Sequence, residues 1–525
     1  MTFNIENMLK PEVYDHSVKN ITLIETHISW VILTGDFAYK IKKPVNFGFL
    51  DFSTLEKRKQ FCDQEITLNS RLAADIYLEV VAIAGTADNP RISASNTAFE
   101  FAVKMAQFPQ SAQLDNMLAA GDLKLEHMDA VGHMIANFHQ STNICDKNMT
   151  FGDKDAVYQP VDENFKQIKE NLKSTDYADR LTMLSQWSKS ESTRMQSVFS
   201  GRKTDGFIRQ CHGDMHLRNL VWLNNKPMAF DCIEFNSKLS WIDVISEIAF
   251  LVMDLQDRKQ QKLANRFLNT YLEHTGDYGG LIVLPFYLCY RALVRAKVNA
   301  LRLNQNDLRN DERNKTITAF ESYLELAVTY TQVQEPKIII MRGLSASGKS
   351  TVSQKLLDDI GAIRIRSDVE RKRLFETTST NDAPVEVDKN INTGIYSKNA
   401  SQQTYTKLIE LTSITIQAGY SVVVDAAFLK HEQRELFRQL AQRLEVPFVI
   451  LEITAPAELL RQRIAQRKND VSDADLAVLE HQLSNWQPLH EEEFSTAVRV
   501  DTSEQLDTAL LIEKLNEYNS NDTKT

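Results

Sequence analysis

The distribution of hydrophobic and polar positions divides the chain into a strand-rich beginning, a helical middle and a C-terminal part in which both elements alternate. Near the N-terminus, short runs of β-branched and aromatic residues bounded by turn residues are typical of strands. These runs cover residues 21–24, 30–33, 37–42 and 101–105. The motif Ser53-Thr54-Leu55-Glu56 predicts the start of a helix, because Ser followed three residues later by Glu forms a capping box. From about residue 109 helical patterns dominate.

A polar stretch that ends in Pro336 interrupts the helical pattern and predicts a domain boundary at residues 331–336. The next run, at 337–341, is rich in β-branched residues and typical of a strand buried in a parallel sheet. Helical patterns separate it from further expected strands, at residues 362–366, 421–425, 447–453 and 498–500. This alternation predicts a doubly wound, mainly parallel α/β sheet over residues 336–520.

Composition narrows the class of protein. The chain has 525 residues, 43% of them hydrophobic, which supports ordinary globular cores. A net charge of -10 and a pI of about 5.7 argue against a nucleic-acid-binding surface. Five cysteines without a CxxC pair indicate free thiols in a reducing cytosol. The N-terminus lacks a signal pattern, and the most apolar run, residues 281–294, is interrupted by Arg291 and too short for a membrane span. We therefore expect a cytoplasmic protein without a membrane segment.

The stretch from His212 to Asp231 carries the first candidate chemistry. Asp214 is followed five residues later by Asn219, and a short apolar run, a turn at 224–227 and a return strand then lead to Asp231. Such a hairpin would bring Asn219 and Asp231 together. Phosphoryl transfer from ATP needs a carboxylate that accepts the proton of a hydroxyl, together with an amide oxygen and a second carboxylate that hold magnesium.

This stretch resembles the catalytic loop of the aminoglycoside phosphotransferase and choline kinase family, relatives of the protein kinases. The resemblance implies an α+β, protein-kinase-like domain of two lobes over residues 1–330, with a small lobe at about 1–108 and a large lobe at about 109–330. It also implies that Asp214 is the catalytic base, that Asn219 and Asp231 are magnesium ligands, and that His212 braces the loop.

The same resemblance assigns a phosphate-binding lysine to the third strand, and Lys40 is the preferred residue. Lys42 lies on the same face of that strand, so the sequence leaves both open. Glu65, on the following helix, would pair with Lys40 and orient it, although a solvated glutamate is an equal alternative. The glycine-rich GxGxxG loop of protein kinases is missing, and residues 25–29 stand in its place. How the triphosphate is covered therefore stays open.

Other charged residues of this half favour structural roles. His139 is interpreted as a packed or capping histidine. Glu234 could contact an acceptor or form an ordinary salt bridge, and the latter is preferred. Asp243 is expected to cap a helix or brace the loop. Arg291 and Arg295, spaced i, i+4, could pair internally or face an anionic acceptor, and the former is preferred.

A complete GxxxxGKS motif follows the strand at 337–341 and precedes a helix, which is the context that such a phosphate-binding loop requires. Its backbone amides would wrap the phosphates, while Lys349 reaches the β- and γ-phosphates and Ser350 ligates magnesium. The expected nucleotide-binding residues are Gly343, Ser345, Ala346, Ser347, Gly348, Lys349, Ser350 and Thr351.

The C-terminal part resembles small P-loop kinases such as gluconate kinase, polynucleotide kinase and the zeta-toxin relatives. The resemblance implies that Asp368 activates the acceptor hydroxyl, with Arg371 holding the acceptor, and that Asp425 lies near the metal ion. It also implies that Arg463 and Arg467, in front of a lid segment, neutralise charge on the γ-phosphate, against the alternative of a solvated helix face.

These expectations combine into a bifunctional, ATP- and Mg²⁺-dependent phosphotransferase in which each half acts on a hydroxyl of a small molecule, such as a sugar or amino sugar. Neither acceptor follows from the sequence. One alternative makes one half a nucleotide-sensing regulatory module. Another makes the C-terminal half a toxin-like kinase of a nucleotide sugar.

Overall fold

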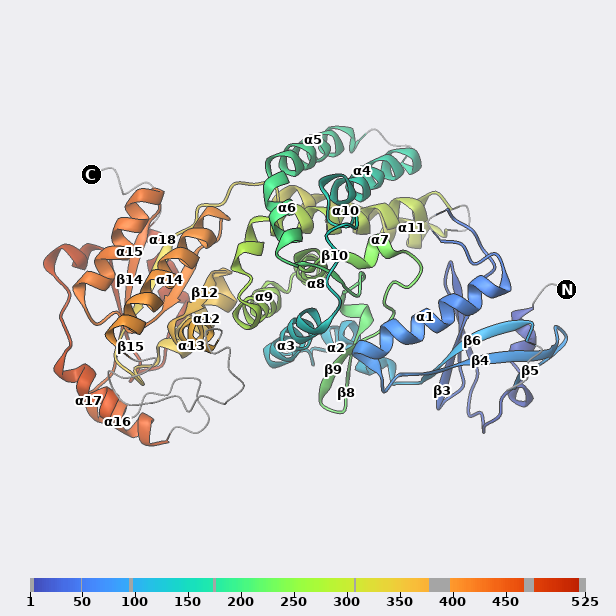
Figure 1. Cartoon of the computed structure of the whole chain (residues 1–525), viewed down its shortest axis with the longest axis horizontal. Helices are drawn as coiled ribbons and strands as arrows, with labels where there is room; N and C mark the ends of the chain where they lie inside the picture. The colour runs from blue at the N-terminus through green and yellow to red at the C-terminus, as the bar shows by residue number, and fades with distance from the viewer. Residues whose placement is uncertain are drawn as a thin grey trace. The chain divides into compact units, whose positions relative to one another are not determined.

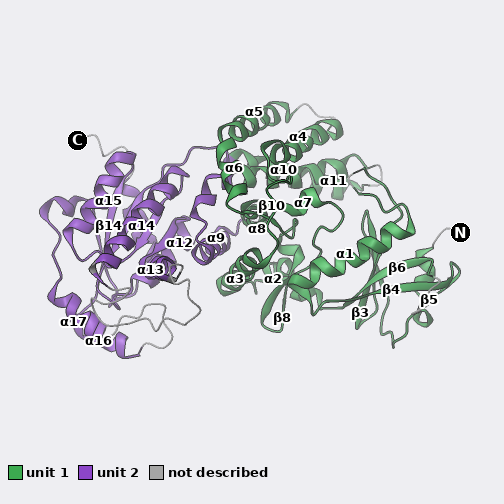
Figure 2. Cartoon of the chain, in the orientation of Figure 1, with its two compact units in different colours: residues 1–258, 286–328 green, residues 259–285, 329–525 purple. Residues whose placement is uncertain are grey.

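The chain forms two compact units in the computed structural model, which describes residues 4–48, 50–93, 98–172, 176–305, 308–376, 397–466 and 476–518. The first unit combines Met1–Arg258 with Phe286–Val328, and the second combines Lys259–Pro285 with Thr329–Thr525 (Figure 2). Within the described residues, no helix has the length and apolarity needed to cross a lipid bilayer. All five cysteines are buried free thiols, as expected.

A six-stranded antiparallel sheet forms the N-terminal part of the first unit, in the order β1-β2-β3-β6-β4-β5 (Figure 1). The strands are β1 (Thr22–Glu25), β2 (Ser29–Leu33), β3 (Phe37–Lys42), β4 (Tyr77–Thr86), β5 (Asn89–Ser93) and β6 (Glu100–Ala106). The sequence did not predict β4 and β5. Helix α1 (Leu55–Ala73) packs on β4 and β6. It begins after Thr54, whose hydroxyl accepts the N–H of Lys57, so the cap lies one residue beyond Ser53.

Helices make up most of the rest of the first unit, as the helical pattern predicted. They are α2 (Leu114–Ala120), α3 (Leu125–Ser141), α4 (Lys154–Asn171), α5 (Ala178–Arg194), α6 (Gln196–Thr204), α7 (Ser237–Ser240), α8 (Val244–Asp257), α10 (Leu284–Leu303) and α11 (Asn310–Thr329). Asp243 caps α8 through the N–H of Ile245. Two small antiparallel ladders lie among the helices: β7 (Ile208–Gln210) with β10 (Trp241–Asp243), and β8 (Leu220–Leu223) with β9 (Lys226–Ala229).

The β8–β9 hairpin turns more tightly than the sequence predicted. Asn224 and Asn225 alone form the turn, with φ angles of 52° and 58°, and Pro227 is already in the return strand opposite Trp222. Two successive left-handed residues give the turn that best matches the twist of the strands, and Asn tolerates that conformation. The turn therefore ends two residues earlier than the predicted span of 224–227.

The second unit contains a five-stranded parallel sheet in the order β12-β13-β11-β14-β15. Its strands are β11 (Ile338–Arg342), β12 (Ile363–Arg366), β13 (Val422–Asp425), β14 (Phe448–Thr454) and β15 (Ala497–Asp501). Its helices include α12 (Lys349–Ile360), α13 (Ser367–Glu376), α14 (Lys398–Gln417), α15 (His431–Leu444), α16 (Ala457–Gln466), α17 (Leu476–Ser484) and α18 (Thr508–Glu517). The predicted fold class, an α+β part followed by an α/β part with a parallel sheet, is confirmed.

The prediction of a single domain boundary near residue 330 assigned residues 259–285 to the first unit, whereas the structure assigns them to the second. Residues 259–285 contain α9 (Gln261–Thr275) and the 3-10 helix η5 (Tyr278–Ile282), and they belong to the second unit. Helix α9 packs on α12 and on β12, the edge strand of the parallel sheet. The side chain of Asn269 accepts the N–H of Arg364 at 2.8 Å and donates to the carbonyl of Ala362 at 3.0 Å. An uncovered edge strand exposes unpaired backbone groups. Helix α9 covers this edge of the sheet, and the sequence pattern does not reveal that cover.

We expect Asn269→Ala to destabilise the second unit, because two buried backbone groups of the edge strand lose their partner. At about 1–3 kcal/mol for each unsatisfied group, the free energy of unfolding should fall by roughly 2 kcal/mol or more. Hydrogen exchange of β12 in the full chain measures this loss. Lys262→Ala, which removes an ion pair with Asp359 whose lysine is largely exposed, is the control and should change little. Unchanged protection of β12 in Asn269→Ala would contradict the assignment.

Candidate active sites

The loop between β7 and β8, residues 211–219, is held by two carboxylates of α8. Glu247 accepts the backbone N–H of His212 at 3.0 Å and that of Gly213 at 2.6 Å. Asp254, about two turns further along the same face of α8, accepts the N–H of Leu217 at 3.0 Å. Burial raises the pKa of Glu247, but the hydrogen bond and charge of His139 and the bond from Gly213 outweigh it and lower the pKa to about 2. The carboxylate is therefore charged when the loop forms.

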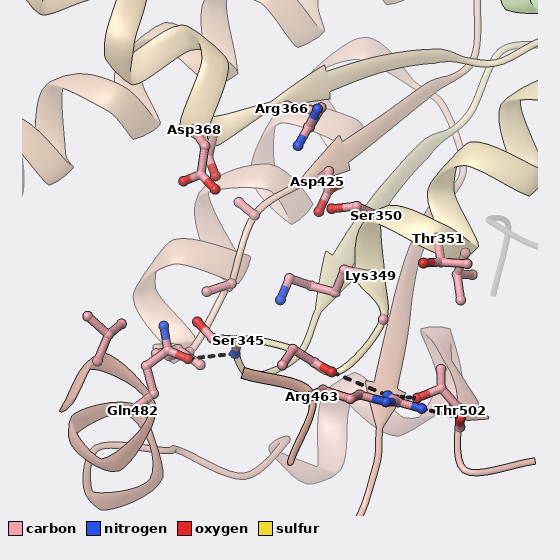
Figure 3. A pocket seen from close by; sticks show the side chains of 18 of the residues that line it. Ser345, Lys349, Ser350, Thr351, Arg366, Asp368, Asp425, Arg463, Gln482 and Thr502 are labelled. Carbon is pink, nitrogen blue, oxygen red and sulfur yellow. Dashed lines mark hydrogen bonds between the residues drawn. The ribbon is translucent and has the colours of Figure 1, made fainter. Parts of the chain in front are cut away.

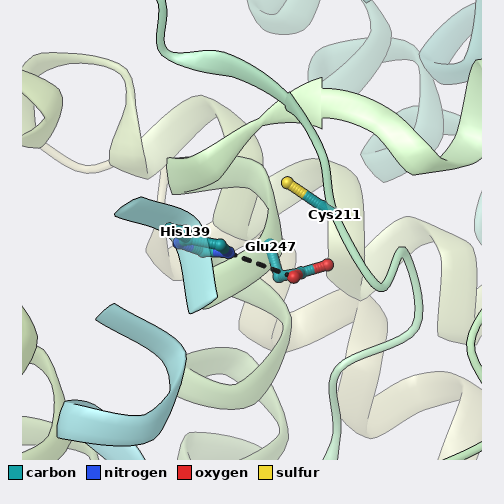
Figure 4. Close-up of side chains that lie close together, drawn as sticks. All are labelled: His139, Cys211 and Glu247. Atoms are coloured by element: carbon teal, nitrogen blue, oxygen red, sulfur yellow. Dashed lines mark hydrogen bonds and ion pairs between the residues drawn. The ribbon is translucent and has the colours of Figure 1, made fainter. Parts of the chain in front are cut away.

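His139, Cys211 and Glu247 form a buried cluster beneath this loop (Figure 4). Their potential ligand atoms all lie within 4.8 Å of one another, as in a metal site. However, the two oxygens of Glu247 already accept two peptide N–H groups and the imidazole Nε2 of His139, which lies 3.1 Å away. The cluster is explained as support for the loop, and His139 is packed and paired, as its sequence context favoured.

Asp214 and Asn219 lie together at the exposed end of the loop. The amide nitrogen of Asn219 donates to both the carbonyl oxygen and the Oδ2 of Asp214, each at 3.0 Å. The His216 Nε2 atom lies 3.3 Å from the same carboxylate. Burial raises the pKa of Asp214, but the charge and hydrogen bond of His216 outweigh it and hold the pKa well below its usual range. Asp214 is therefore an ionised group able to receive a proton from a substrate bound beside it.

The β8–β9 hairpin returns the chain to this place. The N–H of Phe230 donates to the carbonyl of Asn219 at 3.0 Å, and the imidazole of His212 donates to the carbonyl of Phe230 at 2.9 Å. Asp231 follows with a φ of 65°, an unusual conformation for a residue other than glycine, and its N–H donates to the hydroxyl of Tyr77. The predicted proximity of Asn219 and Asp231 is thus present, with His212 as the brace between them.

A chain of ion pairs separates the roles of the two lysines that the sequence left open. The Lys40 Nζ atom lies 2.7 Å from Glu65 Oε1 and 2.5 Å from Asp231 Oδ1. The Lys42 Nζ atom lies 2.7 Å from Glu65 Oε2 and is also paired with Glu234. The side chain of Lys42 is 1% exposed and that of Asp231 is 49% exposed. Only Lys40 of the two thus reaches the open edge of the site, whereas Lys42 and Glu234 complete its buried base.

Glu65 lies at the centre of this chain and is fully buried. Burial raises its pKa, but Lys40 and Lys42 lower it to about 2. The sequence identified Glu65 and Lys40 as a pair and missed that Lys42 shares the same carboxylate. The alternation of residues 40 and 42 along one face of the strand was the signal that could have suggested a shared partner.

The residues present at this edge fit a hard divalent cation. The amide nitrogen of Asn219 is engaged by Asp214, which leaves its amide oxygen to turn toward a ligand. The carboxylate of Asp231 is half-exposed beside it. Amide and carboxylate oxygens are the ligands that Mg²⁺ prefers.

The loop between β11 and α12 requires residues that accept a tight, strained path. A Cβ atom on Gly343 would lie 2.6 Å from the carbonyl oxygen of Ile453, so the close approach requires glycine. Ala346 and Gly348 have φ angles of 63° and 93°. The ammonium group of Lys349 donates to the carbonyls of Gly343 and Leu344 at 2.9 and 2.8 Å, and it therefore arches over the loop. This is the geometry of a phosphate-binding loop at a helix N-terminus.

Three side chains from distant segments hold this loop (Figure 3). Gln482 accepts the N–H of Ser345 at 2.7 Å, and Thr502 donates to the carbonyl of Ser347 at 2.7 Å. Arg463 donates to the carbonyl of Ala346 at 3.2 Å and to the hydroxyl and carbonyl of Thr502. The sequence predicted none of the contacts of Gln482 and Thr502, because no local pattern marks them.

A cavity of about 1230 Å³ opens over the loop. Its lining includes predicted site residues: Ser345, Ala346, Gly348, Lys349, Ser350, Thr351, Asp368, Asp425 and Arg463. In Figure 3 the hydroxyl of Ser350 and the carboxylate of Asp425 turn toward one another, an oxygen pair that suits Mg²⁺. Arg463, which braces the loop, also lines the cavity. Arg467, the second predicted lid arginine, lies outside the described residues.

Further residues that line the same cavity come from α13 and from the end of β12. Asp368 is in the first turn of α13 and pairs with Arg371 at 3.3 Å. Arg366, the last residue of β12, also lines the cavity and was not predicted. Gly343 and Ser347 of the predicted set lie behind the lining residues, where they shape the loop.

Comparison with known proteins divides the chain in the same way. A family model described as an AAA domain matches residues 338–489. Over nearly the whole chain, uncharacterized proteins of Mycobacterium tuberculosis and Mycobacterium bovis are 28% identical across 486 residues, which are 92% of this chain and 92% of each relative. These relatives combine both parts in one chain and carry no stated activity.

Solved structures also align with one half or the other. An amicoumacin kinase in complex with AMP-PNP, Ca²⁺ and Ami aligns with 60% of this chain and 90% of that protein, at 13% identity and a TM-score of 0.39. A choline kinase from Cryptosporidium parvum aligns with 59% and 89%, at 12% identity and a TM-score of 0.38. A gluconokinase from Sinorhizobium meliloti aligns with 35% and 98%, at 19% identity and a TM-score of 0.25. These are the kinase groups that the motifs resembled.

We expect Glu247→Ala to loosen the loop of residues 211–219, because the N–H groups of His212 and Gly213 and the imidazole of His139 lose their acceptor. With about 1–3 kcal/mol for each unsatisfied buried group, the free energy of unfolding of the first unit should fall by about 3 kcal/mol or more. Urea unfolding and hydrogen exchange of residues 211–219 measure the effect. Glu170→Ala, an exposed position on α4, is the control. Unchanged exchange of the loop in Glu247→Ala would show that the loop is held by other contacts.

Proposed function

We propose that the chain is an ATP-dependent phosphotransferase with two sites, each of which transfers the γ-phosphoryl group to a hydroxyl of a small molecule. The observation that carries the proposal is that each unit gathers the three groups this reaction needs. The first unit brings together Lys40, Asp214 and the pair Asn219 and Asp231. The second gathers the phosphate-binding loop, Asp425 and Asp368 around one cavity.

In the first unit, Asp214 serves as the base. The acceptor hydroxyl attacks the γ-phosphorus, its proton passes to the Asp214 carboxylate, and the bond between the γ-phosphorus and the bridging oxygen breaks to release ADP. Lys40, held by Glu65, binds the phosphates from the sheet side. Magnesium bound through Asn219 and Asp231 would neutralise the charge on the triphosphate. Asp214 has to stay in position during the reaction, and Glu247 and Asp254 hold the loop that carries it.

In the second unit, the peptide N–H groups of the loop and the N-terminus of α12 bind the phosphates, and Lys349 reaches the terminal ones. Asp368 accepts the proton of the acceptor hydroxyl, with Arg371 beside it. Ser350 and Asp425 would hold magnesium. The acceptor of each half is a small molecule in this proposal, and neither nucleic acid nor a membrane is a partner.

One feature favours a second candidate function for the first unit. The turn between β1 and β2 contains only residues 26–28, closed by the hydroxyl of Thr26, which accepts the N–H of Ser29. So short a turn offers few backbone N–H groups with which to cover a triphosphate. The first unit could then bind nucleotide and control the second without turnover of its own.

We expect Asp214→Asn and Lys349→Ala each to silence one activity and spare the other. Loss of a general base costs about 10²–10⁴-fold in turnover, since the hydroxyl then lacks a proton acceptor. The measurement is mass spectrometry of a cell metabolite extract incubated with Mg·ATP, in which each variant should lose a different phosphorylated product. Asp63→Asn, at an exposed position, and Lys407→Ala, at a partly exposed position that does not line the cavity, are the matched controls. If the first unit binds nucleotide yet no product depends on Asp214, the regulatory function is the correct one.

The pH dependence of the first activity is a separate test of Asp214. Because its pKa lies below the ordinary value of 3.8, the carboxylate stays ionised throughout the neutral and mildly acidic range. We expect kcat/KM of the Asp214-dependent product to show no loss of the base between pH 8 and about pH 5, since that ratio reports ionisations of the free enzyme. A fall of kcat/KM within that pH range would contradict the assignment of the proton acceptor to Asp214.

A further inference from the structure

Helix α9 carries a charged residue, Glu273, that binds two arginines of β12, and one of them lines the cavity of the second unit. Glu273 Oε2 lies 2.9 Å from the Arg364 guanidinium, and Glu273 Oε1 lies 3.1 Å from that of Arg366. The two arginines alternate along the edge strand, so one carboxylate binds both. The side chain of Arg366 is 12% exposed and lines the cavity.

Arg366 stands between the two carboxylates that the proposed reaction uses. Its Cα atom is the register partner of Asp425 on the neighbouring strand, and Asp368 follows two residues later. Figure 3 shows the guanidinium at the same end of the cavity as Asp425 and Asp368, on the far side of Asp425 from Lys349. Burial lowers the pKa of Arg366, but the charges of Glu273, Asp425 and Asp368 outweigh it and raise the pKa. The guanidinium is thus attracted by three carboxylates at once.

Arg366 forms its ion pair with Glu273. Without that carboxylate, the same attraction would draw Arg366 toward Asp425 and Asp368. A guanidinium bound to Asp425 would compete with a divalent cation for the same oxygens.

We propose that Glu273 is a positioning residue of the C-terminal site: it holds Arg366 against the cavity wall and thereby keeps Asp425 and Asp368 available to a magnesium ion and to the acceptor. This rests on the proposed function, in which Asp425 lies at the magnesium site. A working part of the second site is then supplied by residues 259–285, which precede the last helices of the first unit in the sequence.

Other contacts of α9 anchor the helix without touching the cavity. Arg266 binds Asp358 of α12 through its Nε at 2.8 Å and its second nitrogen at 2.5 Å. Neither residue lines the cavity. Arg266→Gln therefore removes an anchor of comparable geometry and leaves the pair of Glu273 and Arg366 intact, which makes it the matched control.

The test is a magnesium titration of nucleotide binding in the full chain, with a fluorescent ATP analogue as the probe. Only the part of the binding that Lys349→Ala removes is counted. In Glu273→Gln, the magnesium concentration at half-saturation should rise about 5- to 30-fold, the range of coupling within one ion-pair network. In Arg266→Gln it should stay at the wild-type value. The double variant Glu273→Gln/Arg366→Gln should return to the value of Arg366→Gln alone, because the competing guanidinium is gone.

The outcomes separate the inference from the function on which it rests. If the wild-type chain shows no magnesium-dependent binding that Lys349→Ala removes, the proposed function of the second unit fails. If that binding exists but Glu273→Gln titrates like the wild type, or Arg266→Gln shifts equally, the positioning role is overturned. An additive double variant overturns it as well. Glu273→Asp keeps the charge and should recover most of the magnesium affinity, which distinguishes a lost ion pair from a damaged fold.

Discussion

A buried carboxylate that accepts backbone N–H groups is the interaction on which the first site depends. Glu247 accepts two N–H groups at the start of the loop of residues 211–219, and Asp254 accepts a third, so one helix fixes the path of the chain around Asp214. Burying a charge is costly unless it is fully hydrogen-bonded, and His139 supplies the remaining bond to Glu247. In the proposed reaction, a loop organised in this way would already be in place when the substrate binds.

The loop between β11 and α12 in the second unit is also held by side chains, but of a different kind. Its loop holds Ala346 in a left-handed conformation, and that strain is offset by bonds from Gln482, Thr502 and Arg463 to successive loop residues. Here the bracing groups are neutral side chains and one arginine, whereas the first unit uses carboxylates. The difference follows from the backbone atoms that need partners: the first loop presents N–H groups to carboxylates, whereas the second presents the carbonyls of Ala346 and Ser347 to Arg463 and Thr502 and the N–H of Ser345 to Gln482.

Because residues 259–285 belong to the second unit and the chain then returns to the first, no single cut of the chain separates the two units. The chain leaves the first unit after α8, covers the edge of the parallel sheet with α9, and returns with α10, where Arg291 donates to the carbonyls of Gly213 and Ser246. A fragment that begins near residue 330 would lack Asn269 and the ion pairs of Glu273. The arrangement solves the edge-strand problem of a small parallel sheet and, in the same contacts, sets the charge balance of its cavity.

Motifs with short-range causes could be predicted from the sequence alone. The GxxxxGKS loop, the hairpin that joins Asn219 to Asp231 and the helix start near Thr54 depend on residues within about ten positions of one another, and local propensity decides them. Other features depend on contacts between residues far apart in the chain. They include the choice of Lys40 over Lys42, the support from Glu247, the role of Thr502 and the membership of α9 in the second unit. The tertiary structure decided these, because alternation along a strand or charge on a helix shows which face a side chain occupies but not which distant partner meets it.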